Sequence, residues 1–134
     1  TEEKITISNP LIWRPILDIR DAVQAYVDAI KCNYTISGEF NITSENITLK
    51  DLGLRIQKTI TKLTNKEIIM DILNIQDNRT YFVNISKAKK ILKFTPLYKI
   101  EDTVTDIYNN ISKFDINNDN HININVFKQI MGNG

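Results

Sequence analysis

The feature that most constrains the fold is an extended apolar run that ends at a carboxylate and continues as an amphipathic helix. Residues 14–22, RPILDIRDA, contain the end of this run and the start of the helix. Asp21 is predicted to be the N-cap, because its side chain can accept the backbone N–H groups that the first helical turn leaves free. Behind it, apolar residues recur at the spacing of one helix face, at Ala22, Ala25, Tyr26, Ala29 and Ile30.

Two arginines, Arg14 and Arg20, lie close to the start of this helix. A guanidinium group offers a planar fork of N–H donors that matches a phosphate group. A helix N-terminus also favours anions, because its N–H groups point outward. The stretch is therefore suited to phosphate groups.

Length and composition fit one domain of 134 residues, or part of a larger protein. The 42% hydrophobic content suffices for a core, and a net charge of +1 gives no support for general nucleic-acid binding, which needs a basic stripe. The chain has one cysteine, Cys32, and one histidine, His121, which argues against a disulfide framework or a zinc site.

With no membrane-spanning apolar run and no signal peptide, we expect a cytoplasmic protein without a membrane partner. Because the chain starts with Thr1, we expect it to be excised from a longer one.

The pattern along the chain predicts short strands that alternate with helices. Thr48, followed three residues later by Asp51, resembles a capping box and opens the most distinct helix. Asn84 is predicted to cap another helix. The order fits an α/β unit, whose few strands would pack best beside further strands. The expected extended segments are 5–7, 11–19, 39–43, 67–73 (a buried strand) and 81–83, and the expected helices are 21–31, 49–63, 86–92, one that opens at 100–102, and 126–131.

Arg14 and Arg79 are the first candidates for a binding site. Arg14 lies in an apolar run, where a half-buried guanidinium needs an anion, and Arg79 lies in a polar loop flanked by extended backbone. Together they would clamp a diphosphate, because bidentate, charge-assisted hydrogen bonds match phosphate geometry. Spacing alone favours the other interpretation, which is a salt bridge with Asp18, Asp21 or Asp77.

One segment of the Asn-rich tail, 115–126, resembles a calcium-binding loop. Asp115, Asn117 and Asp119 supply its positions 1, 3 and 5. Position 6 is an asparagine instead of glycine, and position 12 is Val126 instead of a bidentate acid, so a plain polar turn is the favoured interpretation and we expect no metal site. Neither a glycine-rich nucleotide loop nor a nucleophile elbow occurs, so no catalytic residue is visible.

Three stretches follow the order and spacing of the motifs of one family. They are RPILDIRDA (14–22), GEFNI with NITLKDL (38–42 and 46–52), and DNRTYFVNISKA with ILKFTP (77–88 and 91–96). Together they resemble the C-terminal, substrate-binding part of the extended short-chain dehydrogenase/reductase family. Its members include NAD-dependent nucleotide-sugar epimerases and 4,6-dehydratases.

This resemblance implies that Arg14 and Arg79 contact the diphosphate of a nucleotide sugar and that Tyr81 also binds the substrate. It implies a small α/β portion of a Rossmann-type enzyme, with few short strands and four to five helices. Residues 1–134 are then a single substrate-binding domain. The missing N-terminal half would carry the glycine-rich loop and the Tyr-x-x-x-Lys pair. The parent would bind NAD(P) and form a homodimer, and this portion alone would bind no cofactor.

Two residues depart from the family pattern. Asp18 stands where His or Tyr is frequent, and Lys93 stands where Gly is frequent. Asp18 would repel a phosphate unless it turns away or pairs with Arg20. The leading hypothesis is a nucleotide-sugar-binding portion of an epimerase or dehydratase that is not catalytically complete alone. The alternatives are a portion of a family reductase and a non-catalytic binding module that uses the calcium loop.

Overall fold

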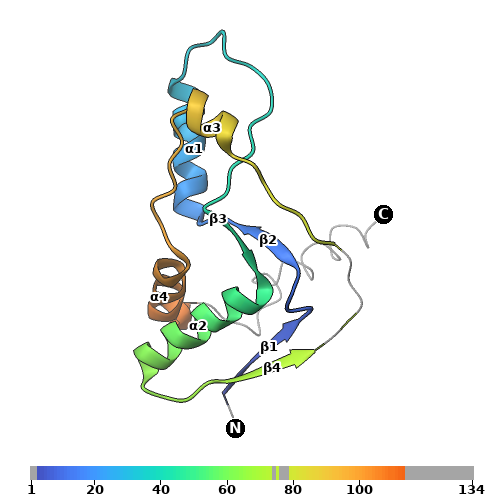
Figure 1. Ribbon diagram of the computed structural model, residues 1–134. Coiled ribbons are helices and arrows are strands. Elements are labelled where there is room, and N and C mark those ends of the chain that lie inside the picture. The colour runs from blue at the N-terminus through green and yellow to red at the C-terminus, as the bar shows by residue number, and fades with distance from the viewer. Residues whose placement is uncertain (1–2, 74, 76–78, 114–134) are drawn as a thin grey trace, which may run out of the picture.

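The computed structural model describes residues 3–73, 75 and 79–113, and within them it forms a mixed α/β unit of four short strands and four α-helices. Figure 1 shows α1 and α3 at one end of an elongated molecule, and β1, β4 and α2 at the other end. The predicted α/β class with few short strands is confirmed. In chain order the elements are β1 (Lys4–Ser8), β2 (Trp13–Ile16), α1 (Ile19–Lys31), β3 (Glu45–Thr48), α2 (Leu49–Thr64), β4 (Ile69–Leu73), α3 (Ser86–Ile91), α4 (Ile100–Asn110) and a 3-10 turn (Ile111–Lys113).

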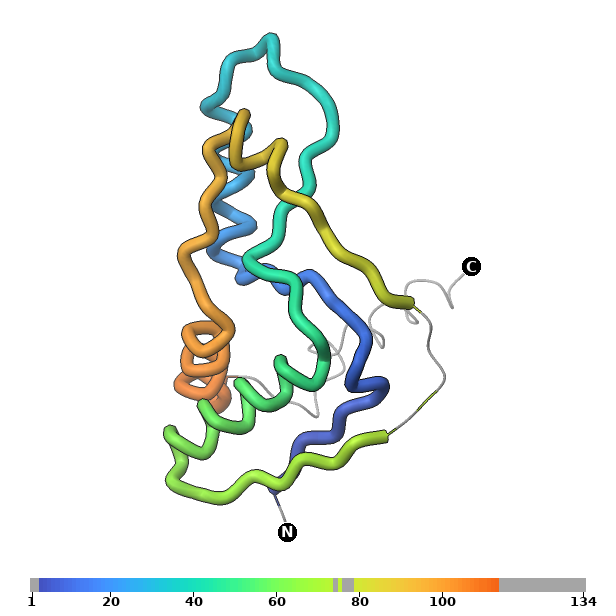
Figure 2. Tube along the Cα trace, viewed as in Figure 1, coloured from blue at the N-terminus to red at the C-terminus, as the bar shows by residue number. Residues whose placement is uncertain are grey.

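The strands form two separate pairs. β1 and β4 are parallel, with Ile7 opposite Ile72, and β2 and β3 are antiparallel, with Arg14 opposite Ile47. α2 continues directly from β3 and packs against β1 and β4, and Figure 2 shows this course of the chain. Gly53 permits the close approach, because a Cβ at this position would lie 2.1 Å from Ile7 Cδ1. α2 therefore links the two strand pairs.

α1 begins two residues earlier than predicted, because a different aspartate caps it. The N-cap is Asp18, whose carboxylate accepts the backbone N–H of Arg20 at 2.8 Å. The prediction that Asp21 is the N-cap is wrong. Asp21 lies inside the first turn, where its carboxylate accepts the backbone N–H groups of Leu97 at 2.9 Å and Tyr98 at 3.2 Å. The carboxylate that was expected to cap the helix therefore binds two backbone amides that are distant in the sequence.

The predicted caps of α2 and α3 have different outcomes. Thr48 caps α2 as predicted: its hydroxyl accepts the Asp51 N–H at 3.1 Å and donates to the Asp51 carboxylate at 2.7 Å. α3 begins at Ser86, and its N-cap position is Ile85, which has no side-chain acceptor. Asn84 lies one residue earlier, and its Oδ1 accepts the Ser86 N–H at 2.9 Å. The Asn84 side chain therefore satisfies the first helical amide from outside the N-cap position.

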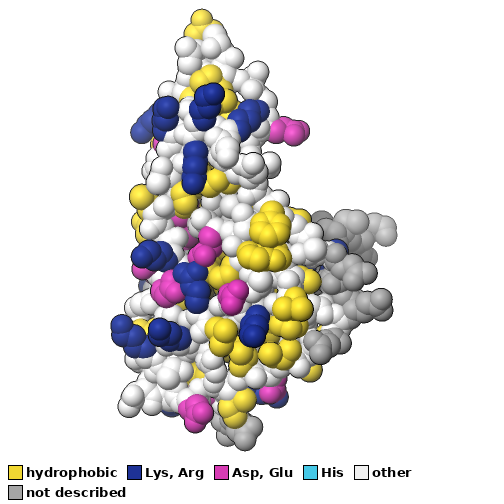
Figure 3. Space-filling model, in the orientation of Figure 1, with side chains coloured by type: hydrophobic (Ala, Val, Ile, Leu, Met, Phe, Trp, Pro, Cys, Tyr) yellow, Lys and Arg dark blue, Asp and Glu magenta, His cyan; other side chains and the backbone are white. Residues whose placement is uncertain are grey.

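Two predicted extended segments do not form strands. Residues 39–43 and 81–83 have no strand partner within the described residues, and the strand β3 follows the first of them. β4 forms close to its predicted place, but Ile69 and Ile72 are exposed, so the prediction that this strand is buried is wrong. The described residues do not cover its outer side, and Figure 3 shows exposed apolar side chains over this end of the molecule.

The best-packed part of the core lies where α1 meets α3. Ala25, Ala88, Leu92 and Phe94 form it. Lys93 turns the chain out of α3 with a φ of 58°, and the Phe94 N–H donates back to the Ala88 carbonyl at 3.3 Å. A residue in the left-handed conformation directly after a helix is a common helix ending, and this conformation favours glycine. This conformation accounts for the glycine in the family pattern.

Arg55 on α2 joins three elements through ion pairs. Its Nη1 donates to Glu45 on β3 at 2.8 Å, and its Nε and Nη2 donate to Glu101 on α4 at 2.7 and 2.6 Å. The hydrogen bonds from Arg55 lower the pKa of Glu101 to about 2, so the pair stays charged at neutral pH. α4 is thereby held against α2.

Replacing Lys93 with glycine is expected to stabilise the chain by about 1 kcal/mol. A side chain with a Cβ pays a penalty of roughly 1–2 kcal/mol in the left-handed conformation, and glycine does not. The free energy of unfolding from urea denaturation measures the gain. Lys90→Gly is the matched control, because it lies inside α3 and should destabilise by about 1 kcal/mol. Equal effects of the two substitutions would contradict the role of the left-handed conformation at Lys93.

Gly53→Ala is expected to lower the free energy of unfolding by about 1 kcal/mol. The new Cβ would meet Ile7 Cδ1 at 2.1 Å and Cγ1 at 3.0 Å. This overpacking outweighs the better helix propensity of alanine. Ile7→Val removes Cδ1, so Gly53→Ala should cost less in that background. Strictly additive effects of the two substitutions in urea denaturation would argue against the contact.

Candidate functional site

The three candidate binding residues meet beside β2. The Arg14 Nη1 donates to the carbonyl of Trp13 at 2.9 Å and also to the carbonyl of Arg79. The Arg14 guanidinium carbon lies 5.4 Å from the centre of the Tyr81 ring. The fold therefore brings the Arg14 side chain, the Arg79 backbone and the Tyr81 ring together, although Arg14 and Arg79 are 65 positions apart in the sequence.

Side chains hold residues 79–83 against the β2–β3 pair. The Thr80 hydroxyl accepts the backbone N–H of Trp13 at 3.0 Å. Asn46 on β3 uses both ends of its amide, because Nδ2 donates to the Val83 carbonyl at 3.0 Å and Oδ1 accepts the Val83 N–H at 2.9 Å. The segment reaches the site through these side chains instead of a strand ladder. No local sequence pattern predicts either contact.

The carboxylate of Asp18 is neutralised by its neighbour. Asp18 is buried, and its two oxygens accept from Arg20, at 2.9 Å from Nε and 2.8 Å from Nη2. Thr103 on α4 donates a further hydrogen bond at 2.5 Å. Hydrogen bonds from Arg20 and then Thr103 hold the pKa of Asp18 well below its usual range, and the same pair raises the pKa of Arg20. The Arg20 guanidinium also lies 3.8 Å from the centre of the Tyr98 ring.

Asp21 connects three parts of the chain at the same corner. It is only 1% exposed. Besides the amides of Leu97 and Tyr98, its carboxylate accepts the Ser44 hydroxyl at 3.0 Å. α1, the segment before β3 and the segment before α4 therefore share this one side chain. Its role is structural, although it is a tertiary anchor and not a cap.

Two of the aspartates that could pair with the candidate arginines have other contacts. Asp18 pairs with Arg20, and Asp21 accepts from a hydroxyl and two backbone amides. Asp77 and the calcium-like loop at 115–126 lie outside the described residues. Among the described residues, no three His, Cys, Asp or Glu side chains gather to hold a metal ion. In the same part of the chain, no helix has the length and apolar character to span a bilayer.

The comparisons with known proteins place the fold in one class. No family model matches the sequence, and no curated protein matches it. Among solved structures, the chain shares its fold with part of the NAD-dependent UDP-sugar epimerases and related enzymes of the short-chain dehydrogenase/reductase family. The resemblance predicted from three sequence stretches is confirmed at the level of the fold.

Particular structures show how far the likeness extends. UDP-glucuronic acid 4-epimerase from Bacillus cereus is 24% identical with a TM-score of 0.65, and the match covers 82% of this chain and 35% of that chain. UDP-N-acetylglucosamine 4-epimerase from Bacillus cereus is 25% identical with a TM-score of 0.64, over 79% and 37%. L-threonine dehydrogenase from Phytophthora infestans, 18% identical, matches with a TM-score of 0.63 over 82% and 37%. The chain spans about a third of these relatives, and the fold alone does not select a sugar substrate.

Asp18→Asn is expected to lower the midpoint of thermal unfolding by roughly 5 °C at pH 7. The pKa of Asp18 is lower in the folded chain than its unfolded value of about 3.9, so the ionised carboxylate stabilises the fold above about pH 4. This contribution is lost as the pH falls towards the folded pKa. The difference between variant and wild type should therefore shrink at pH 3, which circular dichroism melts can measure.

Asp28→Asn is the matched control for this experiment. Asp28 also lies on α1 and accepts an exposed hydrogen bond from Gln24 at 2.7 Å. Its replacement should change the midpoint little at either pH, because exposed polar pairs contribute little. A loss of stability in Asp18→Asn that is equal at both pH values would contradict the role of the ionised carboxylate.

Proposed function

We propose that this chain is the nucleotide-sugar-binding part of an NAD(P)-dependent sugar epimerase or dehydratase. The position of Arg14 supports this function most directly: its guanidinium is hydrogen-bonded to the carbonyls of Trp13 and Arg79, beside the Tyr81 ring. These contacts hold the planar group in one orientation, which suits bidentate binding of a diphosphate. Residues 1–134 would form one substrate-binding domain.

The charge of Asp18 is compatible with an anion bound by Arg14. Asp18 follows the same strand and would repel a phosphate if its charge were unpaired. Arg20 neutralises this charge through two hydrogen bonds, and the Asp18 side chain is buried. Tyr81 is 53% exposed, so its ring is accessible to a bound group beside the guanidinium. Arg79 contributes its carbonyl to the position of Arg14, and a second contact with the diphosphate is part of this proposal.

The reaction would need a second part of the protein. The sequence contains no glycine-rich dinucleotide loop and no Tyr-x-x-x-Lys pair. A nicotinamide cofactor bound in the parent protein would supply the hydride chemistry, and this chain would bind the nucleotide and orient the sugar. A reductase of the same family would use the same contacts, so these contacts do not separate the two reactions.

Arg14→Ala in the full-length protein is expected to weaken the binding of UDP-, GDP-, CDP- and dTDP-sugars by about ten- to a hundredfold, whichever of them bind. Losing a hydrogen bond to a charged group costs roughly 1.5–3 kcal/mol. Titration calorimetry gives the dissociation constants. Arg14→Lys keeps the charge but not the fork, so its affinity should lie between those of the wild type and the alanine variant.

Lys62→Ala is the matched control, because it removes a cation from the last turn of α2. It should leave the affinities unchanged. An unchanged affinity in a correctly folded Arg14→Ala variant would show that the diphosphate role is wrong. If the wild-type protein binds none of the four classes of nucleotide sugar, the proposed function itself is wrong.

A further inference from the structure

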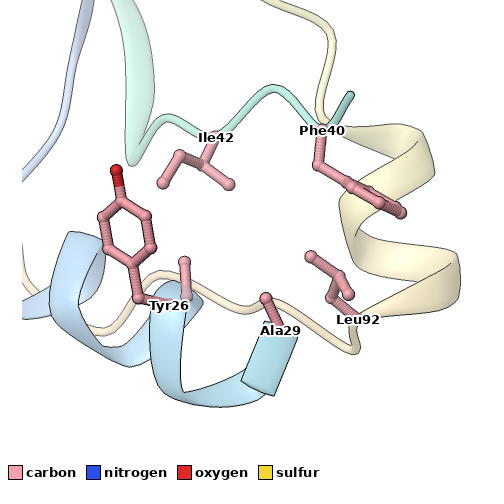
Figure 4. A pocket seen from close by; sticks show the side chains of 6 residues that line it. Tyr26, Ala29, Phe40, Ile42 and Leu92 are labelled. Atoms are coloured by element: carbon pink, nitrogen blue, oxygen red, sulfur yellow. The ribbon is translucent and has the colours of Figure 1, made fainter. Parts of the chain in front are cut away.

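A cavity of about 470 Å³ lies between α2 and α4. This volume is within the range of small-molecule sites. The groove between α1 and α3 is lined by apolar and aromatic side chains, as Figure 4 shows, whereas the α2–α4 cavity carries charged ones. Side chains of both helices line the cavity: Arg55, Lys58, Lys62 and Leu63 from α2, and Glu101 and Thr105 from α4.

The carboxylates near the cavity are already bound by Arg55. Its Nη1 donates to Glu45 at 2.8 Å, and its Nη2 donates to Glu101 at 2.6 Å. Glu101 therefore reaches into the cavity with its charge neutralised. The guanidinium group is held by the same contacts and is not available to a ligand.

Two further cations of α2 line the cavity without such partners. Within the part of the chain that the structure describes, neither Lys58 nor Lys62 has an ion pair or a side-chain hydrogen bond. Both side chains are exposed and lie four residues apart, on one face of the helix. Like charges at this spacing destabilise a helix. The helix dipole favours Lys62, in the last turn, but its effect does not extend to Lys58.

The remaining polar groups of the cavity leave the ammonium groups as its hydrogen-bond donors. The Thr59 hydroxyl donates to the Arg55 carbonyl at 2.8 Å, and the Thr105 hydroxyl donates to the Glu101 carbonyl at 2.7 Å. Leu63 is 37% exposed and supplies apolar surface beside them. The methylene stems of lysines add to such a surface. The cavity thus combines two cations with an apolar wall.

We propose that this cavity binds a small phosphate monoester, with its phosphate between Lys58 and Lys62 and its body against Leu63. A terminal phosphate carries a charge of about −1.5 to −2 at pH 7, which matches two ammonium groups better than a carboxylate does. Both phosphates of a nucleotide sugar are esterified, so it offers no terminal phosphate to this cavity. The proposed site is therefore separate from the one at Arg14 and does not depend on the proposed function.

Titration calorimetry of the full-length protein with phenyl phosphate tests the proposal. Lys58→Ala and Lys62→Ala should each weaken binding by about tenfold, because each removes a charge-assisted hydrogen bond. Both lysines are exposed, so these variants should fold normally. Lys50→Ala is the matched control, because this exposed lysine also lies on α2 but outside the cavity, and it should leave the affinity unchanged.

Two further ligands test the chemistry of the site. Phenyl sulfate has the same body with a single charge, so it should bind about tenfold more weakly than phenyl phosphate. Inorganic phosphate lacks the body and should also bind more weakly. If inorganic phosphate and phenyl phosphate bind equally well, the cavity holds an adventitious ion only and the proposal is overturned.

The Arg14 site provides a crossed comparison. Arg14→Ala should leave the affinity for phenyl phosphate unchanged, and Lys62→Ala should leave the affinities for nucleotide sugars unchanged. Loss of phenyl phosphate binding in Arg14→Ala, with normal binding in both lysine variants, would show that the probe binds at Arg14 and overturn the proposal. No binding of phenyl phosphate at millimolar concentration would also overturn it. Failure of the proposed function is seen separately, in the titrations with nucleotide sugars.

Discussion

Two buried aspartates at the start of α1 connect the two ends of this molecule. Asp18 joins α1 to α4 through Arg20 and Thr103, and Asp21 joins α1 to the backbone that leads into α4. A buried carboxylate is costly unless donors satisfy its oxygens, and guanidinium, hydroxyl and amide donors do so here. β2 ends two residues before Asp18. The strand that carries Arg14 is therefore tied to α4 by the same charges.

The candidate site depends on the Asn46 side chain, which makes the pair of hydrogen bonds that the backbone of a neighbouring strand would make. The Asn46 amide both donates to and accepts from Val83, as a neighbouring strand would, and this holds residues 79–83 beside Arg14. Such a contact joins residues 37 positions apart and has no sequence signature. Spacing alone could not bring Arg14 and Tyr81 together, and only the family resemblance suggested that they share a site.

Features of the fold that depend on neighbouring residues could be predicted, and those that depend on distant ones could not. Thr48 and α2 are local, because the cap and the apolar stripe lie within one stretch. Asp18 and Asp21 are one helical turn apart and are equally good caps by type. The amides at 97–98, which bind Asp21, decide between them. The predicted strand at 39–43 has the right alternation but lacks a partner within the described residues.

The register of the two strand pairs also bears on how the chain folds. Lys4 must find Ile69 to begin the parallel pair, and Trp13 must find Thr48 to begin the antiparallel one. α2 needs only contacts between close neighbours. The entropy of closing long loops opposes the strand pairs until they form, and such distant contacts slow folding. We therefore expect α2 to form before the two strand pairs close.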